Sequence, residues 1–449
     1  MSRLNIIKFE YRNNSKEIYS IVENLDWAVL LDSNSAKFPN QNYDIISCNP
    51  IKKIFGKGTD SIFIENSEEK HIESDPINVL RENMDLDSNH DELPFTGGAI
   101  GFLSYDQGNT YENINQKSDD FKMPYIAFGI YDWAIILDHK KKETILVFKN
   151  KNNLIENLIT KLSNEILITE DDSFTVTSDY KSNLTYEEYE KRFKKIQKYI
   201  TDGDCYQINF SQRFSLSYEG SAWSAYRKLC NSYAAPYSAY MNYPFAKIMC
   251  FSPERFLYHK GDFVETRPIK GTRPVSSDQT LNSKYLNDLS TSKKEKAENL
   301  MIVDLLRNDF GRNCEFGSVN VSELFKIETF SNVHHLVSTV QGKISSDSDI
   351  FKLLRECFPG GSITGAPKIR AMQIINELEK NNRGIYCGAI GYISNNNQSD
   401  LNIAIRTAIT INNKIYFWGG GGITSDSVAS SEYEETLDKI KPLLNSLRR

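Results

Sequence analysis

The chain has 449 residues, of which 40% are hydrophobic and 25% are charged, and this composition excludes a largely disordered protein. Its 53 basic and 59 acidic side chains leave a formal net charge of −6, so we expect neither nucleic acid nor a membrane surface as a partner. No apolar run approaches the ~20 residues that span a bilayer, and the first residues lack a signal-peptide core. We therefore expect a soluble protein of the cytoplasm.

The first part of the chain predicts short strands joined by turns, at 27–31, 43–47, 53–55 and 62–65. An apolar run at 125–137, interrupted by Asp132, and a second run at 144–148 predict a hairpin with long strands. Helical spacing follows at 154–167. The polar stretch 169–183 then predicts a boundary between an N-terminal region, 1–168, and a catalytic region, 185–445.

The second region opens on Thr185 and Glu188, whose spacing forms a capping box at the start of a helix. Strands are predicted at 205–216, 238–243, 247–252, 263–267, 403–411 and 415–418. Helices are predicted at 293–307, at 368–379 and from around 430 onward. Because strands and helices mix without a regular βαβ alternation, we predict an α+β fold with large antiparallel sheets.

One segment is repeated within the chain. The sequence Gly-Ala-Ile-Gly-Phe-Leu-Ser at 98–104 returns as Gly-Ala-Ile-Gly-Tyr-Ile-Ser at 388–394, so that only two positions differ. Chance similarity between two glycine-rich strands is one interpretation. The other is a fold built from two similar halves, each with a strand that passes close to its neighbour.

Two pairs of glutamates are candidates for binding a metal ion. Glu295 and Glu298 lie three residues apart on a predicted helix, and Glu432 and Glu435 have the same spacing. Two facing pairs would make an oxygen-rich site suited to Mg²⁺, which takes one or two carboxylates and keeps several waters. The alternative is purely structural, because Ser292 and Glu295 also have capping-box spacing and acids in a first turn favour the helix dipole.

Two further segments carry possible chemistry. Four consecutive glycines, 419–422, could direct backbone N–H groups at an anion, although a flexible turn is the simpler interpretation. Lys270 lies between Arg267 and Arg273. A lysine close to other cations has its charged form disfavoured, which makes it a usable nucleophile, whereas a lysine in a solvated turn has no such role.

Long segments of the chain resemble the chorismate-utilising enzymes in order and spacing: 252–256, 266–272, 297–309, 333–338, 358–368 and 419–435. The N-terminal region is similar to the matching part of the component I families of anthranilate synthase and aminodeoxychorismate synthase, through 30–33 and 97–106. This resemblance implies two similar halves with large antiparallel sheets, packed as a sandwich with outer helices.

Two positions distinguish branches of that family. Gln207 stands where the water-using members carry a lysine base, and a neutral amide cannot deprotonate water. Lys270 stands where anthranilate synthases have alanine, and in this it resembles the aminodeoxychorismate synthase branch. That branch aminates chorismate at C4 for p-aminobenzoate and folate synthesis. Amination at C2, as in anthranilate synthase, is the nearest alternative, and a binding module without activity is an alternative of another class.

The resemblance also implies a role for each matching residue. Lys270 would add to ring C2 of chorismate and expel the C4 hydroxyl, with Glu254 as general acid and base. Glu298 and Glu435 would bind Mg²⁺, with Glu295 and Glu432 behind them. The remaining expected substrate-binding residues are Tyr386, Arg406, Gly421, Gly422, Ser362, His335 and Gln207.

The sequence also bears on the source of ammonia and on a second ligand. No segment resembles a glutaminase, so ammonia would come from solution or from a separate glutamine amidotransferase subunit. Leu31, Asp32 and Ser33 match a region that holds tryptophan in members of the family. We therefore expect a possible tryptophan site in the N-terminal region.

Overall fold

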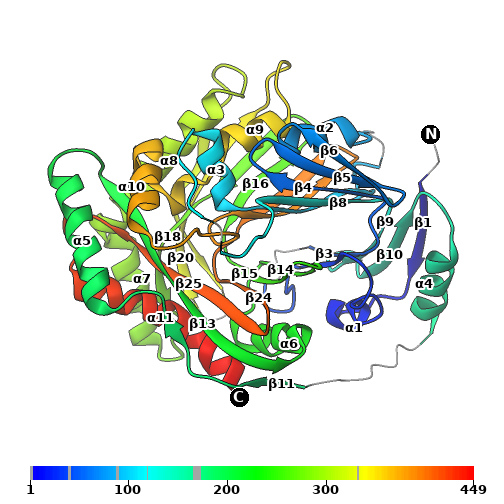
Figure 1. Ribbon diagram of the computed structural model, residues 1–449, viewed down its shortest axis with the longest axis horizontal. Helices are drawn as coiled ribbons and strands as arrows, with labels where there is room; N and C mark the ends of the chain where they lie inside the picture. The colour runs from blue at the N-terminus through cyan, green and yellow to red at the C-terminus, as the bar shows by residue number, and fades with distance from the viewer. Residues whose placement is uncertain are drawn as a thin grey trace.

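The computed structural model describes residues 4–38, 42–86, 90–118, 120–164, 173–330 and 333–448. Two large sheets lie one above the other, and helices cover their outer faces (Figure 1). Every strand pair within the described residues is antiparallel, from the β1–β10 pair at one edge to the β18–β20 pair at another. The predicted α+β sandwich of antiparallel sheets is confirmed.

The first sheet has 13 strands within the described residues. Its path runs through β1 (Asn5–Phe9), β10 (Glu143–Phe148), β9 (Trp133–Asp138), β3 (Tyr43–Ser47), β2 (Ala28–Asp32), β14 (Tyr237–Asn242), β15 (Lys247–Ser252), β24 (Thr407–Ile411), β25 (Lys414–Ile423), β13 (Gln207–Gly220) and β11 (Phe174–Val176). Two short strands also pair with β13, namely β12 (Lys181–Ser182) and β21 (Gly365–Ala366).

The second sheet has 12 strands in the same part of the chain. Its path runs through β18 (Ile269–Pro274), β20 (Val333–Lys343), β17 (Phe263–Arg267), β16 (Arg255–Lys260), β23 (Gln398–Ile403), β22 (Ala389–Ser394), β7 (Gly98–Leu103), β8 (Ile126–Tyr131), β4 (Lys52–Lys57), β5 (Asp60–Glu65) and β6 (Glu68–Glu73). The strand β19 (Asn320–Thr329) pairs with β20.

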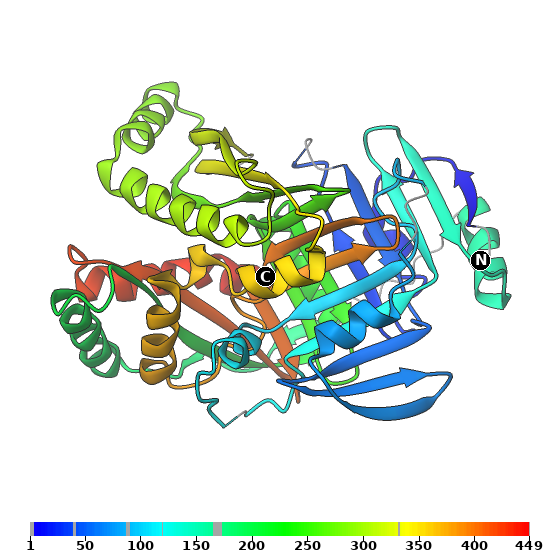
Figure 2. The same cartoon turned by 90° about the horizontal axis from the view of Figure 1, so that it is seen from above.

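The helices lie on the outer faces and at one end of the sandwich. Those packed on the first sheet are α1 (Ser15–Tyr19), α4 (Asn153–Ser163), α6 (Ala222–Tyr233) and α11 (Ala429–Arg448). The others are α2 (Pro76–Asn83), α3 (Tyr105–Tyr111), α5 (Tyr186–Thr201), α7 (Gln279–Thr291), α8 (Lys293–Gly311), α9 (Ile350–Cys357), the 3₁₀ turn η1 (Gly361–Ile363) and α10 (Lys368–Leu378). Figure 2 shows α7 and α8, in yellow-green, at the end of the molecule away from the N-terminus.

The order of strands shows that the chain folds as two similar halves. Reading outward from the β2–β14 pair in the first sheet gives β3, β9, β10 and β1 on one side and β15, β24, β25 and β13 on the other. Reading outward from the β7–β22 pair in the second sheet gives β8, β4 and β5 against β23, β16 and β17. Each strand of the first half therefore has a counterpart in the second half, in the same chain order.

The repeated heptapeptide lies where the two halves meet. Strand β7 pairs with β22, so that Leu103 faces Ala389, Gly98 faces Ser394, and Gly101 faces Gly391 at the centre. A Cβ atom on Gly101 or Gly391 would collide with a backbone carbonyl of the next strand, that of Ala127 or Asp400. The repeat is thus the symmetric contact between the halves, and close strand approach requires its central glycines.

The predicted ranges 1–168 and 185–445 both contribute strands to both sheets. In the first sheet, the strands of the two ranges meet where β2 pairs with β14. In the second sheet, they meet where β7 pairs with β22. The two ranges therefore share one sandwich. Of the polar stretch predicted as their boundary, 169–172 lies outside the described residues.

Four sequence predictions about elements differ from the structure. The run 125–137 is divided at Asp132 into β8 and β9, which belong to different sheets, and only β9 forms the predicted hairpin with β10. Of the run 403–411, only 407–411 form the strand β24, while Ile403 is the last residue of β23 in the other sheet. The four glycines 419–422, interpreted as a turn, continue β25 and pair with β13. The helix expected over 154–167 ends at Ser163, and 165–167 lie outside the described residues.

Apolar side chains fill two layers of the molecule. One core contains residues of both sheets, such as Val29 and Ile45 from the first and Phe102 and Ile390 from the second. The other lies between the first sheet and its outer helices, where Tyr226 of α6 and Leu444 of α11 are buried. In the part of the chain that the structure describes, no helix is long and apolar enough to cross a membrane.

Candidate active site

A cavity of about 450 Å³ gathers nearly all of the predicted catalytic residues. Those that line it are Glu254, Lys270, Glu295, Glu298, His335, Ser362, Tyr386, Arg406, Gly421, Gly422, Glu432 and Glu435. They come from strands of both sheets, from α8 and α11, and from the turn η1. Folding thus brings together residues that are up to 181 positions apart between Glu254 and Glu435.

Lys270 is held in the cavity by an irregularity in β18. The pairing of β18 with β20 shifts between Lys270 and Thr272, and the residue between them, Gly271, has a φ of 81°. A Cβ atom on Gly271 would lie 2.8 Å from Oε2 of Glu295, so glycine is required there on two counts. The Lys270 ammonium nitrogen, Nζ, donates to the carbonyl oxygen of Ser362 at 3.1 Å.

The environment of Lys270 favours the neutral amine. Desolvation by burial lowers the pKa of Lys270, while the carboxylates of Glu298 and Glu254 act in the opposite direction. The sequence analysis weighed Arg267 and Arg273 as nearby cations; the cation that contributes to the lowered pKa of Lys270 is Lys439. Arg267 pairs with Glu328, and Arg273 pairs with Asp288 and Glu295, so carboxylates offset both guanidinium charges.

Glu254 faces the same cavity from the loop between β15 and β16. Its N–H donates to the Ser252 hydroxyl at 3.1 Å and its carbonyl accepts from the N–H of Ile403 at 3.0 Å, which fixes the backbone. The side chain is only 4% exposed. Burial raises the pKa of Glu254 to about 7, although a hydrogen bond from Ser362 and the charge of Lys270 oppose the shift. A carboxyl group with such a pKa can give or take a proton near neutral pH.

His335 and Arg406 also lie on the lining. Nδ1 of His335 is 2.9 Å from the Thr272 hydroxyl, and burial, followed by the charge of Arg406, lowers the pKa of His335 to about 3. The imidazole is therefore neutral at physiological pH. Arg406 lies between β23 and β24 with a φ of 50°, a strained conformation for a non-glycine residue that is common at functional sites.

Tyr386 and Trp418 form an aromatic wall of the cavity. Their rings are stacked, with centroids 5.7 Å apart and planes 3° from parallel. Trp418 belongs to β25, and the glycines 419–422 continue that strand along the lining. A Cβ atom on Gly422 would collide with the amide Nε2 of Gln207, so the predicted substrate-binding residue Gln207 lies behind Gly422, beside the lining rather than on it.

The four glutamates face one another from α8 and α11. The Ser292 side chain caps α8 by accepting from the Glu295 N–H at 3.3 Å, and Arg273 binds Glu295 at 2.8 Å, so the structural interpretation holds for Glu295. Burial raises the pKa of Glu298 and of Glu432. Glu432 accepts from the Ser427 hydroxyl at 2.6 Å. Glu435 pairs with Lys439 at 2.6 Å.

The arrangement of these four glutamates suits a Mg²⁺ ion that is bound by few protein ligands. In the part of the chain that the structure describes, no three carboxylate, histidine or cysteine side chains converge closely enough to enclose a metal ion. Mg²⁺ needs no such enclosure, because one or two carboxylates, waters and substrate oxygens satisfy it. Glu298 on α8 and Glu435 on α11 provide two carboxylates on either side of the cavity.

Sequence reasoning missed several lining residues, among them Asn209, Lys294, Trp418 and Lys439. Helical spacing could have identified Lys439, because it follows Glu435 by four residues on α11. Lys294 precedes Glu298 by four residues on α8 in the same way. Asn209 follows Gln207 by two residues on β13 and shares its face, but no pattern in the sequence marks it.

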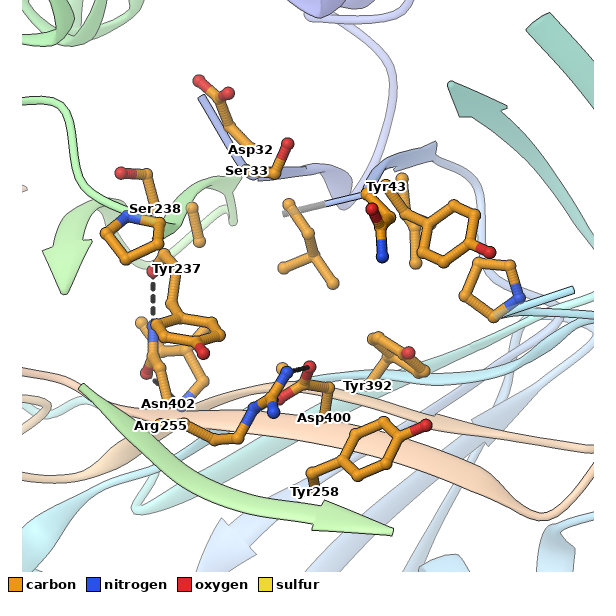
Figure 3. Close-up of a pocket in the computed structure, with 18 of the residues that line it drawn as sticks. Asp32, Ser33, Tyr43, Tyr237, Ser238, Arg255, Tyr258, Tyr392, Asp400 and Asn402 are labelled. Atoms are coloured by element: carbon orange, nitrogen blue, oxygen red, sulfur yellow. Dashed lines mark hydrogen bonds and ion pairs between the residues drawn. The ribbon is translucent and has the colours of Figure 1, made fainter. Parts of the chain in front are cut away.

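A second cavity, of about 380 Å³, lies between the two sheets where the halves meet. Leu31, Asp32 and Ser33 lie on its lining (Figure 3). Figure 3 shows the Asp32 carboxylate pointing away from the other lining side chains. It pairs with Lys16 at 2.6 Å and accepts from the Tyr226 hydroxyl at 3.1 Å.

The opposite wall of this second cavity is polar. Arg255 binds Asp400 at 2.8 Å, and Asn402 donates to the carbonyl of Tyr237 at 2.8 Å (Figure 3). The guanidinium of Arg255 also lies over the rings of Tyr237 and Tyr258. The cavity therefore combines aromatic and charged groups with apolar side chains of β2.

Comparison with known protein families identifies the chain. The family model described as chorismate binding enzyme matches residues 30–445. The chain belongs to the chorismate-binding enzymes. This chorismate-binding enzyme is 41% identical over 450 residues to aminodeoxychorismate synthase component 1 of Escherichia coli (strain K12), with 99% of this chain and 98% of that protein covered.

Other relatives of this chorismate-binding enzyme carry a different name. Anthranilate synthase component 1 of Aquifex aeolicus (strain VF5) is 38% identical over 381 residues, covering 80% of this chain and 76% of that protein. The crystal structure of anthranilate synthase component I from Streptococcus pneumoniae TIGR4 superposes with a TM-score of 0.78. The identity there is 33%, with 90% of this chain and 92% of that chain covered.

Proposed function

We propose that this chorismate-binding enzyme aminates chorismate at ring C4, converting chorismate and ammonia to 4-amino-4-deoxychorismate and water. The observation that carries the proposal is Lys270, whose amine lies in the cavity with a lowered pKa beside Glu254. The Escherichia coli relative named aminodeoxychorismate synthase component 1 is similar over the whole chain and supports the same assignment.

The residues of the cavity divide the reaction between them. The Lys270 amine attacks ring C2 and becomes a secondary ammonium, both conjugated ring double bonds shift, and the C4 hydroxyl leaves as water with a proton from Glu254. Ammonia then attacks C4, both double bonds shift back, Lys270 leaves C2 as a neutral amine, and the new C4 ammonium returns a proton to Glu254. A neutral amine is required for the attack and a protonated carboxyl for the leaving group, and burial of Lys270 and Glu254 favours both forms.

Binding of the two substrate carboxylates needs two cationic regions. We assign the enolpyruvyl carboxylate to Arg406, whose guanidinium fork suits bidentate binding, together with Tyr386. We assign the ring carboxylate to the side of Glu298 and Glu435, where a bound Mg²⁺ would neutralise its charge. Ser362 holds both Lys270 and Glu254 in position through its carbonyl and its hydroxyl.

We further propose that ammonia is delivered in the cytoplasm by a separate glutamine amidotransferase subunit. The Escherichia coli relative is named component 1, which for that protein implies a second component. No motif of a glutaminase stands in the 449 residues. The product would then serve p-aminobenzoate and folate synthesis.

Product analysis tests the proposal. The purified chain is incubated with chorismate, Mg²⁺ and ammonium, and the product is identified by mass spectrometry and NMR. We expect 4-amino-4-deoxychorismate, which retains the enolpyruvyl group, and no reaction when glutamine replaces ammonium. Anthranilate with released pyruvate would instead assign the chain to the chemistry named for the Aquifex relative.

The second cavity supports a further proposal, that a tryptophan molecule binds between the two halves. Its volume of about 380 Å³ and its mixed aromatic and charged lining suit an amino acid with a large ring. Isothermal titration calorimetry should show saturable tryptophan binding to the wild-type chain. The variant Leu31→Trp places an indole in the cavity and should abolish it, and binding that survives this change would contradict the location.

A further inference from the structure

The carboxylate of Glu435, one of the two proposed metal ligands, is paired within the chain. Lys439 follows Glu435 by about one turn of α11, and its ammonium nitrogen lies 2.6 Å from Oε1 of that carboxylate. The same ammonium group donates to the carbonyl oxygen of Gly420 at 2.7 Å. Both side chains belong to the lining of the active-site cavity. Lys439 is therefore held at the cavity by a contact from β25 as well as by its own helix.

Glu298, the other proposed ligand, has a lysine at the corresponding spacing. Lys294 precedes Glu298 by four residues on α8, and its ammonium nitrogen lies 4.0 Å from Oε1 of Glu298. Lys294 also lines the cavity, although its contact is longer than the one on α11. Each of the two helices thus presents one carboxylate and one ammonium group to the same cavity.

The two lysines differ from Arg273, the cation that binds Glu295. Arg273 is held by two carboxylates, those of Glu295 and Asp288. The side chains of Lys294 and Lys439 are 55% and 48% exposed. Because a lysine carries a strongly hydrated charge on a flexible stem, both ammonium groups can move into solvent and remain hydrated. The lysines are exchangeable counterions, whereas the arginine is a fixed one.

A divalent metal ion at Glu435 would be repelled by the ammonium group that is paired there. Mg²⁺ binds a carboxylate oxygen at ~2.0–2.1 Å. An ammonium nitrogen that stayed in its contact with the same oxygen would lie within about 5 Å of the metal, where like charges repel each other even in water. Binding of the metal therefore requires that Lys439 moves away from Glu435, and the loss of this ion pair lowers the affinity for the metal.

We propose that Lys439 competes with Mg²⁺ for the carboxylate of Glu435 and so keeps the affinity of the substrate-free chain for the metal low. Lys294 acts in the same way on Glu298, with a smaller effect because its contact is longer. This inference rests on the metal site of the proposed function. A low intrinsic affinity suits an ion that takes some of its ligands from the substrate, because the ring carboxylate then contributes to metal binding.

Metal binding in the absence of chorismate tests the competition. The probe is Mn²⁺, which prefers the same oxygen ligands as Mg²⁺, and its free concentration is measured by electron paramagnetic resonance before Mg²⁺ is titrated in competition. Lys439→Met removes the charge and keeps a long stem, whereas Lys439→Arg keeps the charge. Lys441→Met is the matched control, because Lys441 pairs with Asp438 at 2.6 Å on another face of α11.

Lys439→Met should bind both metal ions about three- to tenfold more tightly than the wild-type chain, since an ion pair and a like charge are removed. Lys294→Met should tighten binding by about two- to threefold. Lys439→Arg and Lys441→Met should stay within about twofold of the wild type. Unchanged or weaker binding in Lys439→Met overturns the proposal, as does an equal gain in Lys441→Met. No gain in Lys294→Met refutes the role of Lys294.

Glu435→Gln separates the metal site from the role of the lysine. This variant should bind Mn²⁺ at least about tenfold more weakly than the wild type. If both bind Mn²⁺ equally, the proposed metal site is itself refuted. If binding depends on Glu435 but Lys439→Met leaves it unaltered, only the competition is refuted. Circular dichroism checks the fold of each variant, and Lys439→Gln replaces Lys439→Met against the same expectations if the latter does not fold.

Discussion

In the proposed reaction two side chains of the cavity, Lys270 and Glu254, carry the chemistry. Sequence reasoning identified both of them, because their motifs are long and specific. Burial as the main cause of the lowered pKa of Lys270, and the salt bridges of the flanking Arg267 and Arg273, were not visible in the linear pattern.

Replacing Lys270 by alanine should change the product as well as the rate. Loss of a covalent nucleophile should reduce turnover by at least about a thousandfold. With ring C2 no longer occupied by lysine, residual amination should move from C4 toward C2 and yield anthranilate. Chromatography with mass detection measures the product ratio, and Lys260→Ala at the surface is the control. Residual product that remains 4-amino-4-deoxychorismate would show that Lys270 only binds the substrate.

The pH dependence of the rate should report Glu254. Its pKa of about 7 means that the protonated form needed by the leaving hydroxyl is present below pH 7 and is lost above it. The value of kcat/KM, measured at constant free ammonia, should therefore fall as the pH rises through about 7. Glu254→Gln should lower the rate by about 10²–10⁴-fold and remove this limb. A limb that persists unchanged in Glu254→Gln belongs to another group.

At the scale of the elements, β25 shows a difference between the structure predicted from composition and the structure observed. By composition, four consecutive glycines suggest a loop. Here they continue a strand, because neighbouring residues lie so close to three of them that a side chain would not fit. The backbone of Thr436 in α11 lies against Gly419, Ser211 lies against Gly420, and Gln207 lies against Gly422. The divided run 125–137 has a similar lesson, because the apolar pattern continues from β8 of one sheet into β9 of the other.

Replacing glycines of β25 by alanine should destabilise the protein by different amounts at different positions. In Gly419→Ala the new methyl group meets the backbone carbonyl of Thr436, and the free energy of unfolding should fall by about 1–3 kcal/mol. In Gly422→Ala it meets only the mobile end of Gln207, so the loss should stay below about 1 kcal/mol. Urea denaturation measures both variants. Equal losses would mean that α11 can move away from the strand.

At the scale of the whole molecule, both halves of the chain contribute strands to each sheet and side chains to a common core. The fold class and the two-half plan were predictable, because the repeated heptapeptide and the family motifs both indicated them. The placement of the candidate active-site cavity in the second half, and of another cavity between the halves, was not encoded in any local pattern. Both depend on pairings between strands far apart in the chain.

The symmetric contact makes a paired prediction possible. Gly101→Ala and Gly391→Ala each push a methyl group into the backbone of the next strand, so each should lower the free energy of unfolding by about 1–3 kcal/mol. Because the two residues face each other, the double variant should deviate from the sum of the single variants. Gly311→Ala, with nothing near its Cβ position, is the control in urea denaturation. Strict additivity would show that the two sites relax independently.

The pairing of β7 with β22 also affects how the protein folds during its synthesis. Strand β7 ends at Leu103, whereas its partner begins at Ala389. At ~5–20 residues per second, a ribosome needs on the order of tens of seconds to supply that partner. During this interval the nascent first half carries two open strand edges, β7 and β2, which are templates for aggregation. A truncated translation product that stops before β14 should therefore associate with chaperones rather than fold alone.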